Sequence, residues 1–292
     1  MRRSFSLAAL VLSGPVLAVV LFATQPLYAR RVAQVQGMSA QQLLQKVVNN
    51  ELAADKNDNS LWMYTSVMRK PGGSVKEIFL ETNHGILTRR IAEDGKPLDK
   101  EQQEDQVRHI RELVNDPDEA EKVERDQSDD ANKAEDMLRL LPQALLARYG
   151  KRRGDLQALE IKPNPNFQPS SHEAKVFQAM TGVIWVDTKE DRLAEIDGHL
   201  SHRVDFGWGI LGHLDRGGRF HVVQREVAPG HWEIVQLQVD MRGKALLFKS
   251  ISVQQNETRS DYKLLPQDIT LAQAANMLIH QSPSSSRASA GL

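Results

Sequence analysis

Apolar and polar side chains alternate along much of the chain between Gly182 and Pro266. Runs of this kind lie at residues 183–186, 204–208, 235–241 and 245–248. A two-residue period is that of a pleated strand, whose side chains point alternately to its two faces. Residues typical of turns separate the runs, at Gly198 and at 217–218, 229–230 and 242–243. The pattern predicts an antiparallel meander of short strands.

The N-terminal half begins with a pattern of helical period. Ser39 and Gln42 form a capping-box signature, and apolar residues between 43 and 52 fall on one stripe. We expect this helix to pack on the sheet. Alternation then predicts three strands, at residues 61–68, 75–82 and 86–92.

A charged helical segment at about 99–150 interrupts the strands. Asp116 and Pro117 predict a helix start within it, as an N-cap and a first-turn proline. Between Glu101 and Asp136 there are 14 acidic and 5 basic residues. The acids lack the spacing of a calcium loop, so a solvated helix face is favoured over a calcium or partner site. We expect this insertion to be a peripheral cover outside the core of the meander.

Leucines 138, 141 and 145 continue the helical period and predict the stripe that docks this insertion, with Pro142 kinking or restarting the helix. A strand at 155–161 follows, and residues 163–166 break it. A short helix at 173–180 then leads into the meander. Asp268 is the expected cap of a last helix, and the serine-rich residues 282–292 are expected to be disordered.

The N-terminus has the three parts of a secretory signal. Arg2 and Arg3 precede an apolar stretch at 7–23, and Leu27 to Ala29 resembles a cleavage site. We therefore expect residues 1–29 to be a signal peptide that is cleaved near Ala29, which places the mature chain in the periplasm or outside the cell. The alternative is an uncleaved anchor in the inner membrane, because the apolar stretch approaches the length of a bilayer span.

Composition excludes several classes of function. The 37 basic and 38 acidic residues give a net charge of −1, which provides no field for nucleic acid. There are no cysteines, so disulfides and thiolate sites are excluded. A chain of 292 residues can nevertheless bury a full core.

Catalytic signatures are weak. The histidines at 199, 202, 213, 221 and 231 gather in one region. His199 and His202 would face opposite sides of one extended strand, and no ordered ligand spacing appears among the group. Nucleotide loops and nucleophile elbows are also missing from the sequence. We expect neither an enzyme nor a bound metal or cofactor.

The order of elements carries a family resemblance. A strand that ends in a proline-rich corner, a short helix and the run MTGVIWVD at 180–187 precede the meander. From Ser39 to Pro266 this order resembles the LolA-like family of periplasmic proteins, which includes the lipoprotein carrier and a related envelope-stress regulator. The resemblance implies an α+β fold in which an unclosed, curved antiparallel half-barrel has helices covering its concave face. It also implies a single domain at 30–281, with the acidic insertion inside it.

Large aromatic residues are the candidates for an apolar binding site. Trp62 and Tyr64 share one face of an early strand, Phe206 and Trp208 share a face of a later one, and Trp185 lies in a strand that is apolar on both sides. Buried aromatics that merely fill a core remain an equal alternative. The resemblance implies a monomer that binds an acyl chain, a lipid or a lipoprotein. The alternative is an envelope protein-interaction or stress-signalling module of the same fold, with no ligand transport.

Overall fold

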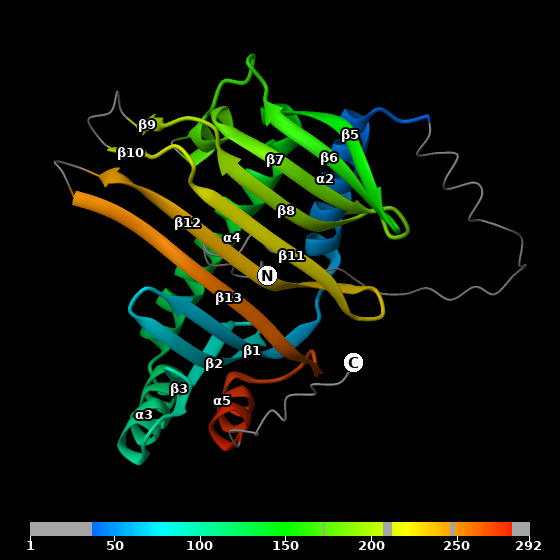
Figure 1. Cartoon of the computed structure of the whole chain (residues 1–292). Coiled ribbons are helices and arrows are strands. Elements are labelled where there is room, and N and C mark those ends of the chain that lie inside the picture. Colours follow the sequence, from blue (N-terminus) through cyan, green and yellow to red (C-terminus); the bar gives the residue numbers. More distant parts are fainter. Residues whose placement is uncertain (1–36, 172, 207–211, 246–248, 282–292) are drawn as a thin grey trace, which may run out of the picture. The chain divides into compact units, whose positions relative to one another are not determined.

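The computed structural model describes residues 37–171, 173–206, 212–245 and 249–281. Over these residues the fold is α+β, and the strands pair antiparallel without closing into a barrel (Figure 1). The predicted fold class and the unclosed sheet are thus confirmed at this level. The described chain divides into two compact units: unit 1 holds residues 60–128 and 258–281, and unit 2 holds residues 37–59 and 129–257.

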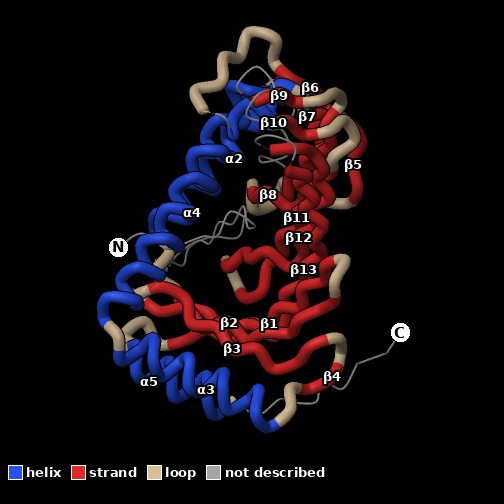
Figure 2. The backbone as a smooth tube through the Cα atoms, turned by 90° about the vertical axis from the view of Figure 1, so that its left-hand side faces the viewer, coloured by secondary structure: helices blue, strands red, loops and turns tan. Residues whose placement is uncertain are grey.

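Unit 1 is a small sheet with helices on one face. Its strand order is β4-β3-β2-β1-β13, and α3 and α5 lie on the same side of β1 to β3 (Figure 2). The elements are β1 (Leu61–Lys70), β2 (Gly73–Thr82), β3 (Gly85–Glu93), β4 (Lys96–Pro97), α3 (Lys100–Asn115), the start of α4 (Pro117–Ala144), the end of β13 (Lys249–Leu265) and α5 (Leu271–His280).

The core of unit 1 lies between this sheet and its helices. Leu61 of β1 and Leu80 of β2 pack in one buried cluster with Ile110 of α3 and Leu278 of α5. Strand residues of one parity therefore face the helices, and the other parity forms the opposite face. Because Ile110 is 2% exposed, α3 belongs to the core, and the expectation of a peripheral cover is wrong for this helix.

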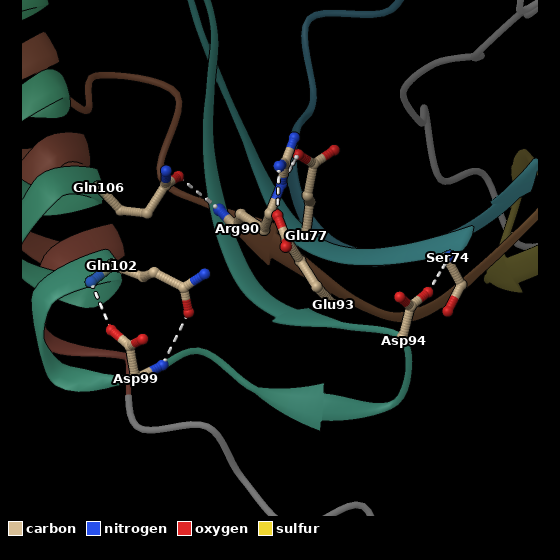
Figure 3. Close-up of polar contacts among 8 residues, drawn as sticks. All are labelled: Ser74, Glu77, Arg90, Glu93, Asp94, Asp99, Gln102 and Gln106. Atoms are coloured by element: carbon tan, nitrogen blue, oxygen red, sulfur yellow. Dashed lines mark hydrogen bonds and ion pairs between the residues drawn. The ribbon is translucent and has the colours of Figure 1, made fainter. Parts of the chain in front are cut away.

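Polar contacts fix α3 against the edge of the sheet (Figure 3). Asp99 accepts a hydrogen bond from the Gln102 backbone N–H, and the Gln102 side chain accepts one from the Asp99 N–H, which forms a capping box. Gln106 Oε1 then accepts from the backbone N–H of Arg90 at 3.1 Å. The Arg90 side chain points away from α3 and donates to Glu77 and Glu93.

Unit 2 is a larger sheet with the order β13-β12-β11-β8-β7-β6-β5, and β10 pairs with β12 and β9. Its elements are α2 (Ala40–Asn57), the end of α4, β5 (Leu145–Arg153), β6 (Leu156–Pro163), the 3₁₀ helix η1 (Glu173–Gln178), β7 (Met180–Asp187), β8 (Arg192–Leu200), β9 (Val204–Phe206), β10 (Gly212–Leu214), β11 (Arg219–Ala228), β12 (His231–Ala245) and the start of β13.

Helix α2 packs on this sheet as predicted. Ser39 and Gln42 form the expected capping box, and Leu43, Leu44 and Val47 are fully buried. They lie in one cluster with residues of α4, η1 and strands β5 to β8. The stripe of apolar side chains on α2 therefore forms the helical side of the unit 2 core.

The acidic segment ends earlier than predicted. Asp116 caps α4 by accepting from the N–H groups of Asp118 and Glu119, which confirms the predicted helix start. However, α4 ends at Ala144, and residues 145–150 are the beginning of β5. The prediction of helix through 150 is wrong there. Leu145 is buried as a strand residue, although its spacing from Leu141 fits a helix.

Two glycines that predict turns lie inside strands instead. Gly198 is in β8, opposite Gly182 of β7. A Cβ atom at Gly182 would lie 2.0 Å from the carbonyl oxygen of Asp197, so glycine is needed for close strand contact. Gly243 is likewise in β12, where a Cβ atom would lie 1.9 Å from the His213 oxygen.

The cap of α5 is also different from the prediction. Thr270, not Asp268, accepts the hydrogen bond from the Gln273 N–H, and Gln273 completes a capping box. Of the described helices, none is both long enough and apolar enough to cross a membrane. The predicted signal peptide at 1–29 and the predicted disordered tail at 282–292 lie outside the described residues.

Candidate functional site

Two of the predicted site residues meet in an aromatic cluster of unit 1. The ring of Tyr64 stacks on Phe79 at 5.1 Å between centroids with an interplanar angle of 4°, and on Tyr262 at 5.1 Å and 26°. Trp62 meets Tyr262 edge to face at 6.1 Å. We call Trp62, Tyr64, Phe79 and Tyr262 the aromatic cluster.

Strand register explains the cluster. Tyr64 of β1 is the direct partner of Phe79 of β2, so their side chains share a face. Tyr262 belongs to β13, which adjoins β1 on its other side. Since Met63 and Leu80 face α3 and α5, the aromatic cluster lies on the opposite face of this sheet.

Polar groups surround the rings. Trp62 donates from Nε1 to Ser60 Oγ at 2.9 Å and from its backbone N–H to Glu81 Oε2 at 3.0 Å. The guanidinium carbon of Arg259 lies 5.3 Å from the centroid of the Tyr64 ring, within cation–π distance. The site thus combines an apolar surface with a cation and a carboxylate, which suits an amphipathic molecule.

The members of the cluster differ in exposure. Trp62 and Tyr64 are only 2% and 5% exposed, whereas Phe79, Tyr262 and Arg259 are half-buried. The half-buried side chains are the ones that a ligand can reach without moving the strands. Sequence reasoning did not select Phe79 or Tyr262. Each is the only aromatic residue of its strand. Only the strand register, which brings both rings to Tyr64, could have identified them as members of the cluster.

Trp185 lies in β7 of unit 2. The guanidinium of Arg153 covers its ring at 4.5 Å, and Arg153 also donates to Glu195 at 2.9 Å. Glu195 in turn meets His221 Nε2 at 3.2 Å. Partial burial opposes ionisation of Glu195, but hydrogen bonds and charges from Arg153 and His221 outweigh it, so the pKa of Glu195 is lowered.

The last two predicted residues are Phe206 and Trp208. Phe206 is half-buried in unit 2, where it packs against the cluster of Ala179, Leu200 and Val204. Trp208 lies outside the described residues. Of the predicted site residues that the structure describes, Trp62 and Tyr64 thus lie in unit 1, and Trp185 and Phe206 lie in unit 2.

Among the described residues, the histidines do not form a three-residue metal site. His221 contacts Glu195, and His199 contacts Thr181 Oγ1 at 3.1 Å. His202 follows the end of β8, so the argument from opposite faces of one strand does not apply to it. Within residues 37–281, apart from the undescribed gaps, no three His, Asp or Glu side chains are grouped so that they could hold a metal ion.

The charges on α4 mostly pair along the helix. Glu119 with Lys122, Glu121 with Arg125 and Glu135 with Arg139 are i,i+3 or i,i+4 pairs. Such pairs support an exposed helix by a few tenths of a kcal/mol each. This pairing agrees with a solvated helix face.

One buried ion pair joins α2 to β8. Glu51 is fully buried and accepts from Arg192 Nε at 2.8 Å, from Arg192 Nη2 at 3.0 Å and from the Leu193 N–H at 2.7 Å. Burial raises the pKa of Glu51, and the bonds from Arg192 and Leu193 offset part of this effect. All carboxylate contacts are internal, so we assign the pair to the structure of unit 2 rather than to ligand binding.

Comparison of the chain with protein-family models, with curated proteins and with solved structures finds no match. The resemblance to the LolA-like family therefore stays a prediction.

Proposed function

We propose that this protein binds a ligand with an apolar chain at the aromatic cluster of unit 1. The observation that carries the proposal is the stacking of Tyr64 between Phe79 and Tyr262. These rings stand on the sheet face opposite the one that α3 and α5 cover. Aromatic rings offer a large, rigid apolar surface that loses little conformational entropy on binding.

The polar groups beside the rings indicate the class of ligand. Arg259 can attract an anionic or polar head group, and the half-buried faces of Phe79 and Tyr262 can contact an alkyl chain. An acyl chain, a lipid or a lipidated protein has this combination of parts. In this proposal the protein carries or senses such a ligand and performs no catalysis.

The test is saturable binding of palmitate or an environment-sensitive apolar dye to the purified chain. Replacing Tyr262 with Ala removes a ring that stacks on Tyr64, and we expect the affinity to fall about tenfold, since an aromatic contact contributes about 0.5–1.5 kcal/mol beyond its buried area. Phe177→Leu is the matched control, because this ring packs in the unit 2 core. No saturable binding, or equal losses in both variants, would contradict the proposal.

A protein-interaction module is the second candidate. Glu101, Glu112, Asp118 and Asp126 are exposed on α3 and α4 and make no ion pair among the described residues. Acids of this kind can meet a basic partner surface. Lipid that co-purifies with the native protein, measured by mass spectrometry, supports the ligand proposal, whereas a stoichiometric protein partner without lipid supports the module.

We also propose that the chain is exported. The basic and apolar segments before Ala29 support this location. The expected mature protein begins at Arg30, which the intact mass of the native protein measures. Retention of residues 1–29 would instead support a membrane anchor.

A further inference from the structure

A groove of about 680 Å³ lies beside α3 in unit 1. One side of α3 provides most of its lining, and Arg89 of β3 provides the rest. The lining residues are Arg89, Lys100, Gln103, Glu104, Val107, Arg108, Arg111, Glu112 and Asn115. Arg89 is the strand partner of Ile78, which packs towards the helices. The groove is therefore on the face opposite the aromatic cluster.

Arg89 is the buried cation of this groove. Its side chain is 6% exposed, and Nη1 donates to the carbonyl oxygens of Leu278, Ile279 and Gln281 at 3.0, 2.7 and 3.0 Å. These carbonyls are at the C-terminus of α5, where backbone oxygens lack helical partners and carry partial negative charge. They bind one end of the guanidinium group.

Not every hydrogen-bond donor of the Arg89 guanidinium group has an acceptor. Its Nε–H is buried and has no hydrogen-bond partner among the described residues. A buried donor without an acceptor lowers stability, and the effect is larger for a charged group. The three groups that accept from Arg89 are neutral carbonyls. No carboxylate in the described part of unit 1 forms an ion pair with Arg89.

The other charges of the groove largely cancel. Lys100 pairs with Glu104 at 3.6 Å, and Arg108 pairs with Asp105. Arg111 and Glu112 do not pair, but both are exposed and of opposite sign, so together they add no net charge to the groove. Arg89 therefore leaves the groove with one uncompensated, buried positive charge, which an anionic ligand would neutralise.

We propose that this groove binds a small organic carboxylate, with the carboxylate at Arg89 and an apolar body along α3. Carboxylates and guanidinium groups form strong charge-assisted hydrogen bonds. Val107 and the methylene stems of Lys100 and Arg111 offer apolar contacts for the body. The volume is within the range of about 300–1,000 Å³ that is typical of small-molecule sites. This site does not depend on the ligand proposed for the aromatic cluster.

The experiment is calorimetric titration of the full chain with octanoate, with 1-octanol and octylammonium as probes of equal chain length. We expect saturable binding of octanoate, and binding of octanol weaker by at least about tenfold because it lacks the charge. Equal affinity for octanoate and octanol would overturn the proposal.

Two variants test whether the carboxylate of octanoate binds at Arg89. Arg89→Gln removes the cation, and we expect the affinity for octanoate to fall at least about tenfold. Because Arg89 also binds the end of α5, Val107→Glu provides a second variant that adds a negative charge to the groove and leaves those carbonyl bonds in place. We expect a similar loss. Arg125→Gln on α4 is the control for removing a cation outside the groove. Unchanged binding in Val107→Glu would contradict the proposal.

One further outcome would also overturn it. If octanoate binding falls in Tyr262→Ala but not in Arg89→Gln or Val107→Glu, the aromatic cluster binds the carboxylate and the groove does not. Binding that is retained in Tyr262→Ala and lost in both groove variants supports the groove, whatever ligand the aromatic cluster binds.

Discussion

Glu51 and Arg192 illustrate how a buried charge depends on its partner. The carboxylate of Glu51 has no contact with solvent and accepts three hydrogen bonds from Arg192 and Leu193. Arg192 also lies near the ring of Trp232, with its guanidinium carbon 5.9 Å from the centroid. Removal of either charge therefore leaves the other charge buried and uncompensated.

We expect Glu51→Ala to lower the free energy of unfolding by about 3–5 kcal/mol, because breaking a buried pair costs more than the pair contributes. The double variant Glu51→Leu with Arg192→Met should lose less, since no charge remains buried. Urea unfolding followed by circular dichroism measures both. Glu190→Ala, an exposed acid nearby, is the control and should change stability by less than about 0.5 kcal/mol. A Glu51→Ala variant as stable as this control would contradict the assignment.

Glu195 makes the stability of the protein depend on pH, and its pKa is shifted in the direction opposite to that of Glu51. Its pKa lies below the ordinary value of 4.5 in the folded protein, so the unfolded chain binds its proton more readily. The stability from Glu195 is therefore present above pH 4.5 and is lost as pH falls through the lower folded pKa.

The expected result is a gap in unfolding free energy between the natural protein and Glu195→Gln of about 1 kcal/mol or less at neutral pH, because the group is partly exposed. This gap should narrow as pH falls below 4.5. Denaturation midpoints at pH 3 to 7 measure it. A gap that widens with acid would show that the sign is wrong.

At the scale of elements, α3 is the part of the acidic segment that supports a core. Ile110 packs against strand residues and against Leu278 of α5. We expect Ile110→Ala to lower the free energy of unfolding by about 2–5 kcal/mol through lost burial and a cavity. His109→Ala, which is exposed on the same helix, controls for helix propensity. Equal effects of the two variants, measured by thermal unfolding, would mean that α3 is peripheral.

Element boundaries with local causes were predictable. Ser39 with Gln42, and Asp116 with Pro117, mark helix starts because the side chains bond to nearby backbone N–H groups. The start of β5 at Leu145 was not predictable, since its leucine fits both a helical stripe and a buried strand. Pairing with β6 decides the matter, and that partner is not encoded in the spacing.

At the scale of the whole molecule, the two units have separate cores. Ile184 belongs to the cluster of unit 2 and Ile110 to that of unit 1, and the clusters share no residue. Each core buries its own strands and helices. The cores are therefore expected to lose their packing separately on heating.

We expect two calorimetric transitions for the full chain, with Ile184→Ala lowering the midpoint of one and Ile110→Ala lowering that of the other. Both changes are deletions in buried apolar clusters, so their sizes are comparable and each serves as the control for the other. A single transition that both variants shift equally would show that the units unfold together.

The sequence by itself determined the α+β class, most strands and the capped starts of α2 and α4, because alternation and capping act between residues close in the chain. It also determined that Trp62 and Tyr64 share a face. Only the tertiary structure decided that Tyr262 completes their cluster, that Trp185 lies under Arg153, and that Arg89 meets the end of α5. Those contacts depend on strand register and helix docking, which join distant residues by packing that no local pattern specifies.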